Sequence, residues 1–328
     1  MKAEAKKQKT MNGIQKVLTS PNFRSYSGLI LVIIIVSIFL SIRCPNFLTA
    51  TNILNVLRQI SVYGILACGM AFAMMTGGID LTVGATAGLC GAIVTKVVVE
   101  GTMPLVPAMI LGLVIGAIVG LVSGAMIAKT GIPPFIMTLG LMTSIRGAAY
   151  LICNGKPIGN LPDNMLFLGL GDILGIPVPI FFMIGTFIIV GIILSKTSFG
   201  RSVYAVGGNY QAAIHSGINA KKVIMYAYMI SGITAALAGV ILSARNASAQ
   251  PTAGTSFETE AIAACAMGGV SFNGGKGAVV GIFFGALLMG IINNGMNLMY
   301  ISSYWQLVVK GIIIIAAVIY SIYNSKRK

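Results

Sequence analysis

The chain has 328 residues, of which 56% are hydrophobic and only 9% are charged. A water-soluble protein of ordinary composition has about 25% charged residues, which cover its surface. The composition therefore excludes a soluble globular protein. The 41 glycines fit the close packing of helices in lipid. We predict an all-α polytopic membrane protein.

The net charge is +15, from 22 Lys and Arg against 7 Asp and Glu. A nucleic-acid partner would require a basic stripe on one folded face. Here the basic residues form small islands between long apolar runs, so we expect no nucleic-acid binding. The 5 cysteines form no CxxC pair, and we expect no metal site.

A transmembrane helix needs about 20 mostly apolar residues. We predict about ten such spans, although several are short or interrupted by glycine and the pattern allows roughly eight to eleven. A cytoplasmic N-terminus puts most of the basic residues on cytoplasmic segments, and an even number of spans returns the C-terminus to the same side. The chain then divides into a cytoplasmic tail (1–25), a transmembrane domain (26–323) and a second cytoplasmic tail (324–328). The expected spans are 26–42, 60–76, 82–99, 104–127, 134–152, 179–195, 223–243, 258–272, 278–299 and 304–323.

The stretch 43–59 separates the first two expected spans. Asn52 is placed to cap a helix. The apolar spacing of Ile53, Leu54 and Leu57 behind it predicts a short interfacial helix.

Asp80 lies in a Gly-rich break, GGIDLTVGA (77–85), between two apolar runs. A carboxylate at membrane depth costs a few kcal/mol unless it is paired or hydrated. Asp80 is therefore either a gate or hinge residue of the translocation pathway, or an N-cap for the span 82–99.

Gly112, Gly116, Gly120 and Gly124 recur at every fourth position of the span 104–127. This spacing places them on one helix face, where a neighbouring helix can approach closely. We interpret the pattern as a packing signal rather than a binding site.

The loop 196–222 is basic and contains no acidic residue. Asn209 can cap a short helix, Gly217 can end it in a left-handed turn, and Asn219 can cap the next span. A short exposed helix is marginal alone. The segment is either a knob that docks into a groove of a cytoplasmic partner or an ordinary basic loop. His215, the only histidine, is expected on the surface or packed.

The Gly-rich segment MGGVSFNGGKGAVVG (267–281) departs from the phosphate-binding loop pattern at Val270 and Gly277. It favours a turn between spans. The chain also lacks the HExxH and GxSxG motifs. We therefore expect no catalytic residues and no enzymatic activity.

Asn293, Asn294 and Asn297 lie inside an apolar run. Buried amides need hydrogen-bond partners, so these side chains either bond neighbouring helices or line a polar pathway. Arg146 and Lys310 allow the same two interpretations.

Five segments together resemble one known family. They are NFLTATNILNVLRQ (46–59), TGGIDLTVG (76–84), FGRSVYAVGGNYQAAIHSGIN (199–219), the stretch 248–281 and NNGMNLMYISSYWQLVVKG (293–311). They are similar to the membrane permeases of bacterial ribose-type sugar ATP-binding-cassette (ABC) importers, the ribose/xylose/galactoside branch. The resemblance covers nearly the whole chain after the N-terminal tail. It implies the ABC importer permease fold, multi-pass, in the bacterial cytoplasmic (inner) membrane.

The resemblance also implies the partners. They are a second permease subunit, expected to form a homodimer, two cytoplasmic ABC ATPase subunits, an extracytoplasmic sugar-binding protein, and a sugar substrate such as ribose. The separate ATPase hydrolyses ATP, so the permease itself is expected to need no cofactor. In this family the loop that matches 199–219 contacts the ATPase. The resemblance carries this role onto Gly200, Arg201, Tyr204, Gly207, Gly208, Asn209, Ser216 and Gly217.

An ion-coupled secondary transporter of a small polar solute is the alternative. It would require ionisable residues near the membrane midplane. Only Arg146 and Lys310 are placed there, since Glu258 and Glu260 are expected at the outer edge. A channel would need no docking loop. We therefore expect ATP-driven alternating access.

Overall fold

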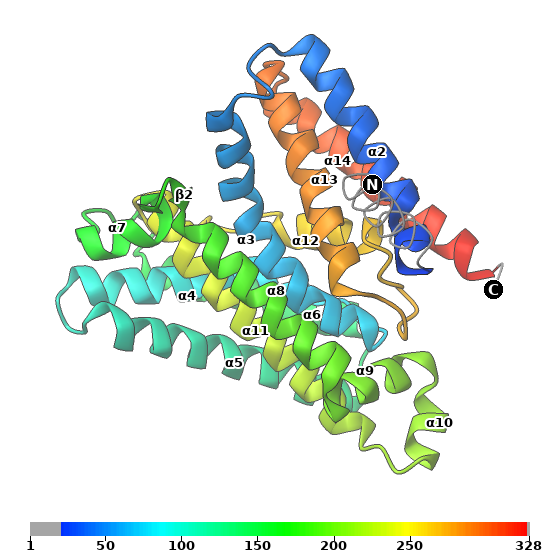
Figure 1. The fold of residues 1–328 in the computed structure, drawn as a ribbon. Helices are drawn as coiled ribbons and strands as arrows, with labels where there is room; N and C mark the ends of the chain where they lie inside the picture. Colours follow the sequence, from blue (N-terminus) through cyan, green and yellow to red (C-terminus); the bar gives the residue numbers. More distant parts are fainter. Residues whose placement is uncertain (1–20, 327–328) are drawn as a thin grey trace, which may run out of the picture.

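The computed structural model describes residues 21–326, a nearly all-helical chain (Figure 1). The expected tails 1–25 and 324–328 lie largely outside the described residues. The helices are α2 (Pro21–Arg43), α3 (Ala50–Met75), α4 (Thr82–Val99), α5 (Leu105–Thr130), α6 (Pro134–Ile152), α7 (Asp163–Leu170), α8 (Val178–Lys196), α9 (Ser198–Gly208), α10 (Tyr210–His215), α11 (Ala220–Arg245), α12 (Phe257–Met267), α13 (Val279–Leu298) and α14 (Ser303–Lys326). Strands β1 (Asp172–Ile173) and β2 (Ile176–Pro177) form a small antiparallel hairpin.

Within the described residues, 8 helices are long and apolar enough to cross a membrane: α2, α3, α4, α5, α6, α8, α11 and α13. Each matches one of the expected spans. The expected span 304–323 lies within α14, a continuous helix of 24 residues.

The expected span 258–272 is wrong. Helix α12 has only 11 residues, which at 1.5 Å per residue extend about 16 Å, roughly half of the hydrocarbon thickness. Glycines 268 and 269 end the helix, and Val270 already belongs to the turn that follows. The apolar run continues through this turn, so hydropathy alone placed a whole span where the chain forms a half-length helix.

Helix α3 lies at the centre of the fold. In its most apolar stretch 83% of the residues are buried, against 6% in α2 and 17% in α6. Helix α11 packs against α3, α4 and α5. The exposed apolar faces of the outer helices, such as Ile118 of α5 and Ile189 of α8, are the surfaces expected to meet lipid.

The four evenly spaced glycines of α5 confirm the predicted close packing. A Cβ atom on Gly116 would collide with the carbonyl oxygen of Gly232, and one on Gly120 with the carbonyl oxygen of Tyr228. Both partners belong to α11. The two helix backbones therefore touch at these positions, as expected for association through small residues.

Replacement of Gly120 by alanine should weaken this packing. Because the obstacle is the α11 backbone rather than a flexible side chain, the helices must separate, at a cost of about 1–3 kcal/mol. We expect a lower thermal unfolding midpoint in lipid nanodiscs. The matched control is Gly185→Ala on α8, where a Cβ meets nothing within 4 Å. An equal loss in both variants would contradict the proposed contact.

The expected short helix after Asn52 is wrong. Helix α3 begins at Ala50, and the Thr49 side chain caps it by accepting from the amide of Asn52 at 3.3 Å. The helix then continues without a break to Met75. The side chain of Asn52 points into the protein and forms a hydrogen bond with Asn294. This interior contact, and not a role as helix cap, explains the position of Asn52.

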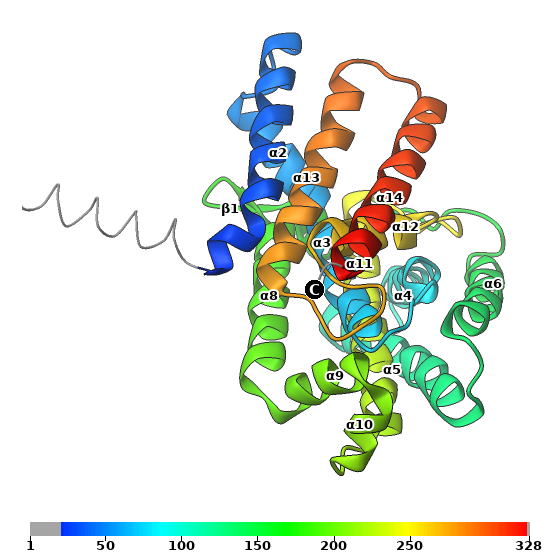
Figure 2. The same cartoon turned by 90° about the vertical axis from the view of Figure 1, so that its right-hand side faces the viewer.

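Helices α9 and α10 stand at one end of the molecule, beyond the ends of α8 and α11 (Figures 1 and 2). We call this the α10 end. The last residue of α3 and the turn 268–278 lie at the same end, because the amide of Gly275 donates to the carbonyl of Met75 at 2.9 Å. The hairpin and α7 lie at the opposite end, where α8 begins.

Candidate functional site

Helix α9 begins inside the loop 196–222. The Thr197 hydroxyl accepts from the amide of Gly200 at 3.1 Å and caps the helix. Val203 and Val206 are buried, and Phe199 stacks on Phe72 with ring centroids 6.1 Å apart. The sequence analysis missed this helix. The apolar residues 199, 203 and 206 follow the i, i+4, i+7 spacing of one helix face, and this pattern could have predicted α9.

Two glycines hold α9 against the transmembrane helices. A Cβ on Gly207 would collide with the carbonyl oxygen of Met75 and approach the amide nitrogen of Gly275 to 2.5 Å. A Cβ on Gly200 would collide with backbone carbonyls at the end of α8. The Tyr204 hydroxyl donates to the carbonyl of Gly277 at 2.9 Å. Helix α9 is therefore fixed to α3, to α8 and to the turn before α13.

Helix α10 matches its prediction. Asn209 caps it by accepting from the amide of Ala212 at 2.9 Å, and Gly217 follows it with φ of +81°. Asn219 accepts from the amide of Lys222 at 3.0 Å and caps α11. The predicted short helix is confirmed, and a second helix, α9, precedes it.

The outer surface of this unit is open. Tyr210 is 38% exposed and Ile214 is 43% exposed on successive turns of α10. Arg201, Gly208 and Ser216 are exposed as well, and a Cβ on Gly208 meets nothing within 4 Å. The eight residues to which the resemblance assigns ATPase contact therefore form two groups. Three face the transmembrane helices: Gly200, Tyr204 and Gly207. The other five lie on the exposed side: Arg201, Gly208, Asn209, Ser216 and Gly217.

Asp80 is fully buried where the chain turns from α3 into α4. Its Oδ1 atom accepts from the amide of Thr82 at 3.0 Å and from the hydroxyl of Thr82 at 2.6 Å. Asp80 and Thr82 thus form an Asx-type turn that leads into α4, whose N-cap position is Leu81 without a side-chain cap. Gly84 of the same TGGIDLTVG motif is also tightly packed, since a Cβ on it would collide with the carbonyl oxygen of Gly254.

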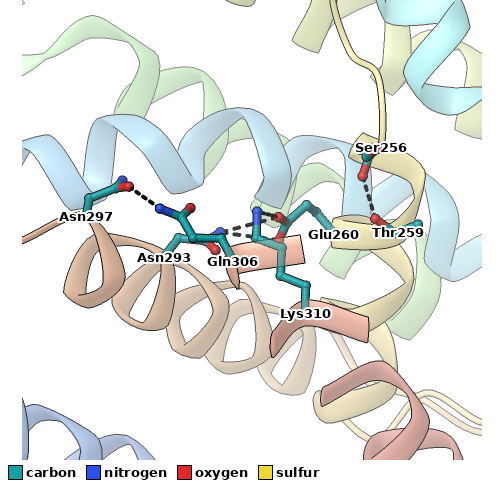
Figure 3. Close-up of polar contacts among 7 residues, drawn as sticks. All are labelled: Ser256, Thr259, Glu260, Asn293, Asn297, Gln306 and Lys310. Atoms are coloured by element: carbon teal, nitrogen blue, oxygen red, sulfur yellow. Dashed lines mark hydrogen bonds and ion pairs between the residues drawn. The ribbon is translucent and has the colours of Figure 1, made fainter. Parts of the chain in front are cut away.

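The asparagines of α13 bond neighbouring helices. Asn294 and Asn52 of α3 exchange two amide hydrogen bonds, of 3.0 and 2.8 Å. Asn293 lies 3.4 Å from both carboxylate oxygens of Glu260 in α12. Asn297 accepts from Gln306 of α14 at 2.9 Å. These contacts fit the interhelical interpretation of the three side chains, and Figure 3 shows those of Asn293 and Asn297.

Glu260 also forms an ion pair with Lys310 of α14, at 2.5 Å. The glutamate is only 4% exposed and the lysine 22%. Glu260 is buried in the protein interior, where the half-length helix α12 packs against α13 and α14 (Figure 3). The buried acid is thus paired with a basic side chain of the neighbouring helix.

Residues 52–318 match the family described as "Branched-chain amino acid transport system / permease component". The chain belongs to this permease family. Its relatives include the ribose import permease proteins of Bacillus subtilis (49% identical, over 90% of each chain) and Escherichia coli K12 (41% identical, over 94% of this chain and 97% of the relative). The L-arabinose transport system permease protein of Escherichia coli K12 is 39% identical over 92% of each chain. No solved structure matches.

Membership of this permease family accounts for the composition and the helices. The chain is a multi-pass inner-membrane protein, and the relatives are permeases rather than enzymes. The names of the relatives confirm the resemblance to ribose-type sugar permeases. None of these relatives is described as an ion-coupled transporter.

Proposed function

We propose that this chain is the permease subunit of an ATP-driven ABC importer that carries ribose or a similar monosaccharide into the cytoplasm. The observation that carries the proposal is the 49% identity to a ribose import permease over 90% of both chains.

The proposed assembly contains two copies of the permease, two ATPases and one extracytoplasmic binding protein. The α10 end faces the cytoplasm in this arrangement. Lys196, Arg201, Lys221 and Lys222 are concentrated there, in agreement with the enrichment of positive charge on cytoplasmic loops. The binding protein then releases sugar at the opposite end.

The α9–α10 unit is the proposed ATPase dock. A groove on the ATPase would receive the exposed side of α10, with Tyr210 and Ile214 as apolar anchors. A displacement of the dock would pass directly to α3 through the Gly207–Met75 contact. It would also reach α13 through the bond from Tyr204 to Gly277. A movement of the ATPase dock would therefore move α3 and α13 together.

Asp80 and the α13 asparagines act as positioning residues in this proposal. Asp80 fixes the start of α4 at the turn that follows α3. Asn293, Asn294 and Asn297 keep α13 in register with α12, α3 and α14. In this proposal the transport pathway opens and closes when these helices move, so the four side chains need not contact the sugar.

Reconstitution tests the proposal. The permease is placed in vesicles with its ATPase, and uptake of labelled ribose, allose and arabinose is measured with and without binding protein and ATP. We expect uptake only when all components are present, and fastest with ribose. An ATPase variant unable to hydrolyse ATP is the control. Uptake driven by a proton or sodium gradient alone would overturn the proposal in favour of the secondary transporter.

A further inference from the structure

The loop between α11 and α12 is unusual for a chain in lipid. Helix α11 ends at Arg245, at the end opposite α10, and α12 provides only 11 residues on the way back. Residues 246–256 must cover the remaining depth without helical structure. Figure 3 shows the irregular chain entering α12 at Ser256, and residues 251–256 form consecutive turns. Irregular backbone occurs at membrane depth only where protein buries it or where it lines a water-filled cavity.

Three contacts give the depth of this segment. The Arg146 guanidinium donates to the carbonyls of Ala253 at 2.5 Å and Pro251 at 3.3 Å. Arg146 lies six residues before the end of α6, about 9 Å along the helix axis. A Cβ on Gly84, the third residue of α4, would collide with the Gly254 carbonyl. The segment 251–256 therefore packs between α6 and the first turn of α4, inside the bundle of apolar helices.

The segment is nevertheless partly exposed. Thr252 and Thr255 are exposed, and Thr143 and Tyr150 of α6 are exposed on the face that also carries Arg146. Positions 143, 146 and 150 follow the i, i+3, i+7 spacing of one helix face. Polar side chains and carbonyls at this depth are costly in lipid. This surface differs from the apolar exposed faces of α5 and α8.

Glu258, in the first turn of α12, adds a carboxylate. Its Oε2 atom is buried and has no hydrogen-bond partner among the described residues. The side chain interacts electrostatically with Arg146. We define the α6–loop wall as Thr143, Arg146, Tyr150, Thr252, Thr255 and Glu258.

We propose that the α6–loop wall lines the path of the transported solute and offers it hydrogen bonds. This inference rests on the proposed function and names the surface that carries out its transport step. A neutral, hydroxyl-rich solute must exchange the hydrogen bonds of water for those of the wall. Arg146 supplies donors, and Glu258 places a carboxylate beside it. The hydroxyl oxygens of Thr143 and Thr255, whose hydrogens are donated to backbone carbonyls, supply acceptors, and Tyr150 presents an aromatic ring. No residue of the α6–loop wall needs to bind the solute tightly, because a transport pathway must release it.

Thiol accessibility tests the wall without relying on transport. All 5 native cysteines are buried, so they should react slowly and give little background labelling in the assembled importer. We expect a charged, membrane-impermeant methanethiosulfonate to modify Thr255→Cys at least about tenfold faster than the lipid-facing control Ile118→Cys. Excess ribose should slow the reaction at Thr255→Cys, and modification should block uptake. Thr143→Cys, from the other side of the wall, serves if Thr255→Cys does not assemble.

Two results would overturn the wall. One is a reactivity of both wall cysteines no greater than that of Ile118→Cys. The other is an efficient disulfide between the Thr255→Cys residues of two copies, because the surface would then be a subunit contact. Fast labelling in an assembly that shows no ATP-dependent uptake would instead reject the proposed function and leave the water-lined wall in place.

Discussion

Sugar uptake should fall by about tenfold or more when Gly207 is replaced by alanine. The new Cβ has no room between the Met75 carbonyl and the Gly275 amide, and these two groups are themselves hydrogen-bonded at 2.9 Å. A misfit of about 1–3 kcal/mol must be relieved by moving α9 away from α3, and each 1.4 kcal/mol changes an equilibrium by tenfold. The measurements are ATP-driven uptake of labelled ribose, ATPase activity and the amount of assembled complex. We expect ATP hydrolysis to continue with little sugar moved.

Gly208 provides matched variants at the next position. A Cβ there meets nothing within 4 Å, so Gly208→Ala should retain far more uptake than Gly207→Ala. Gly208→Trp places a large ring on the exposed side of the dock and should prevent the ATPase from binding, although membrane insertion persists. Similar losses in Gly207→Ala and Gly208→Ala would contradict the distinction between the two sides of α9. Full transport by Gly208→Trp would contradict the docking assignment.

The sequence predicted α10 well because its signals are local. Asn209, Gly217 and Asn219 each act within a few residues of their own position, as caps and left-handed turns do. Helix α9 was missed because its glycines, which are unfavourable within an isolated helix, are explained only by contacts with α3 and α8. Those contacts depend on the tertiary fold and cannot be recognised from the residues next to each glycine in the sequence.

The wrong span at 258–272 has a related cause. Hydropathy measures only how apolar a stretch is, and the alanines of α12 are apolar whether the helix spans the membrane or half of it. The positions of Glu258 and Glu260 in its first turn were compatible with an outer edge. Their burial depends on the irregular loop 246–256, whose path is fixed by Arg146 and Gly84 on two other helices. The polar wall could not be predicted for the same reason.

Replacement of Glu260 by glutamine should destabilise the protein by about 3 kcal/mol, the lower end of the range for breaking a buried ion pair. The lower end applies because Lys310 retains 22% exposure. The variant leaves the lysine charge without its partner at the contact between α12 and α14. A loss of this size lowers the unfolding midpoint by roughly 5–10 °C. Thermal unfolding of the permease in lipid nanodiscs measures it.

The double variant Glu260→Gln/Lys310→Met separates the ion pair from simple loss of packing. Removal of both charges leaves nothing uncompensated, so the double variant should be more stable than Glu260→Gln alone. Lys129→Met, at an exposed lysine at the end of α5, controls for the loss of one positive charge and should not change the midpoint. If the losses of Glu260→Gln and Lys310→Met simply add, the two side chains act independently. The contact that holds α14 to α12 would then be apolar packing. A positive coupling energy would instead assign to this ion pair the attachment of the last helix to the half-length helix that follows the polar loop.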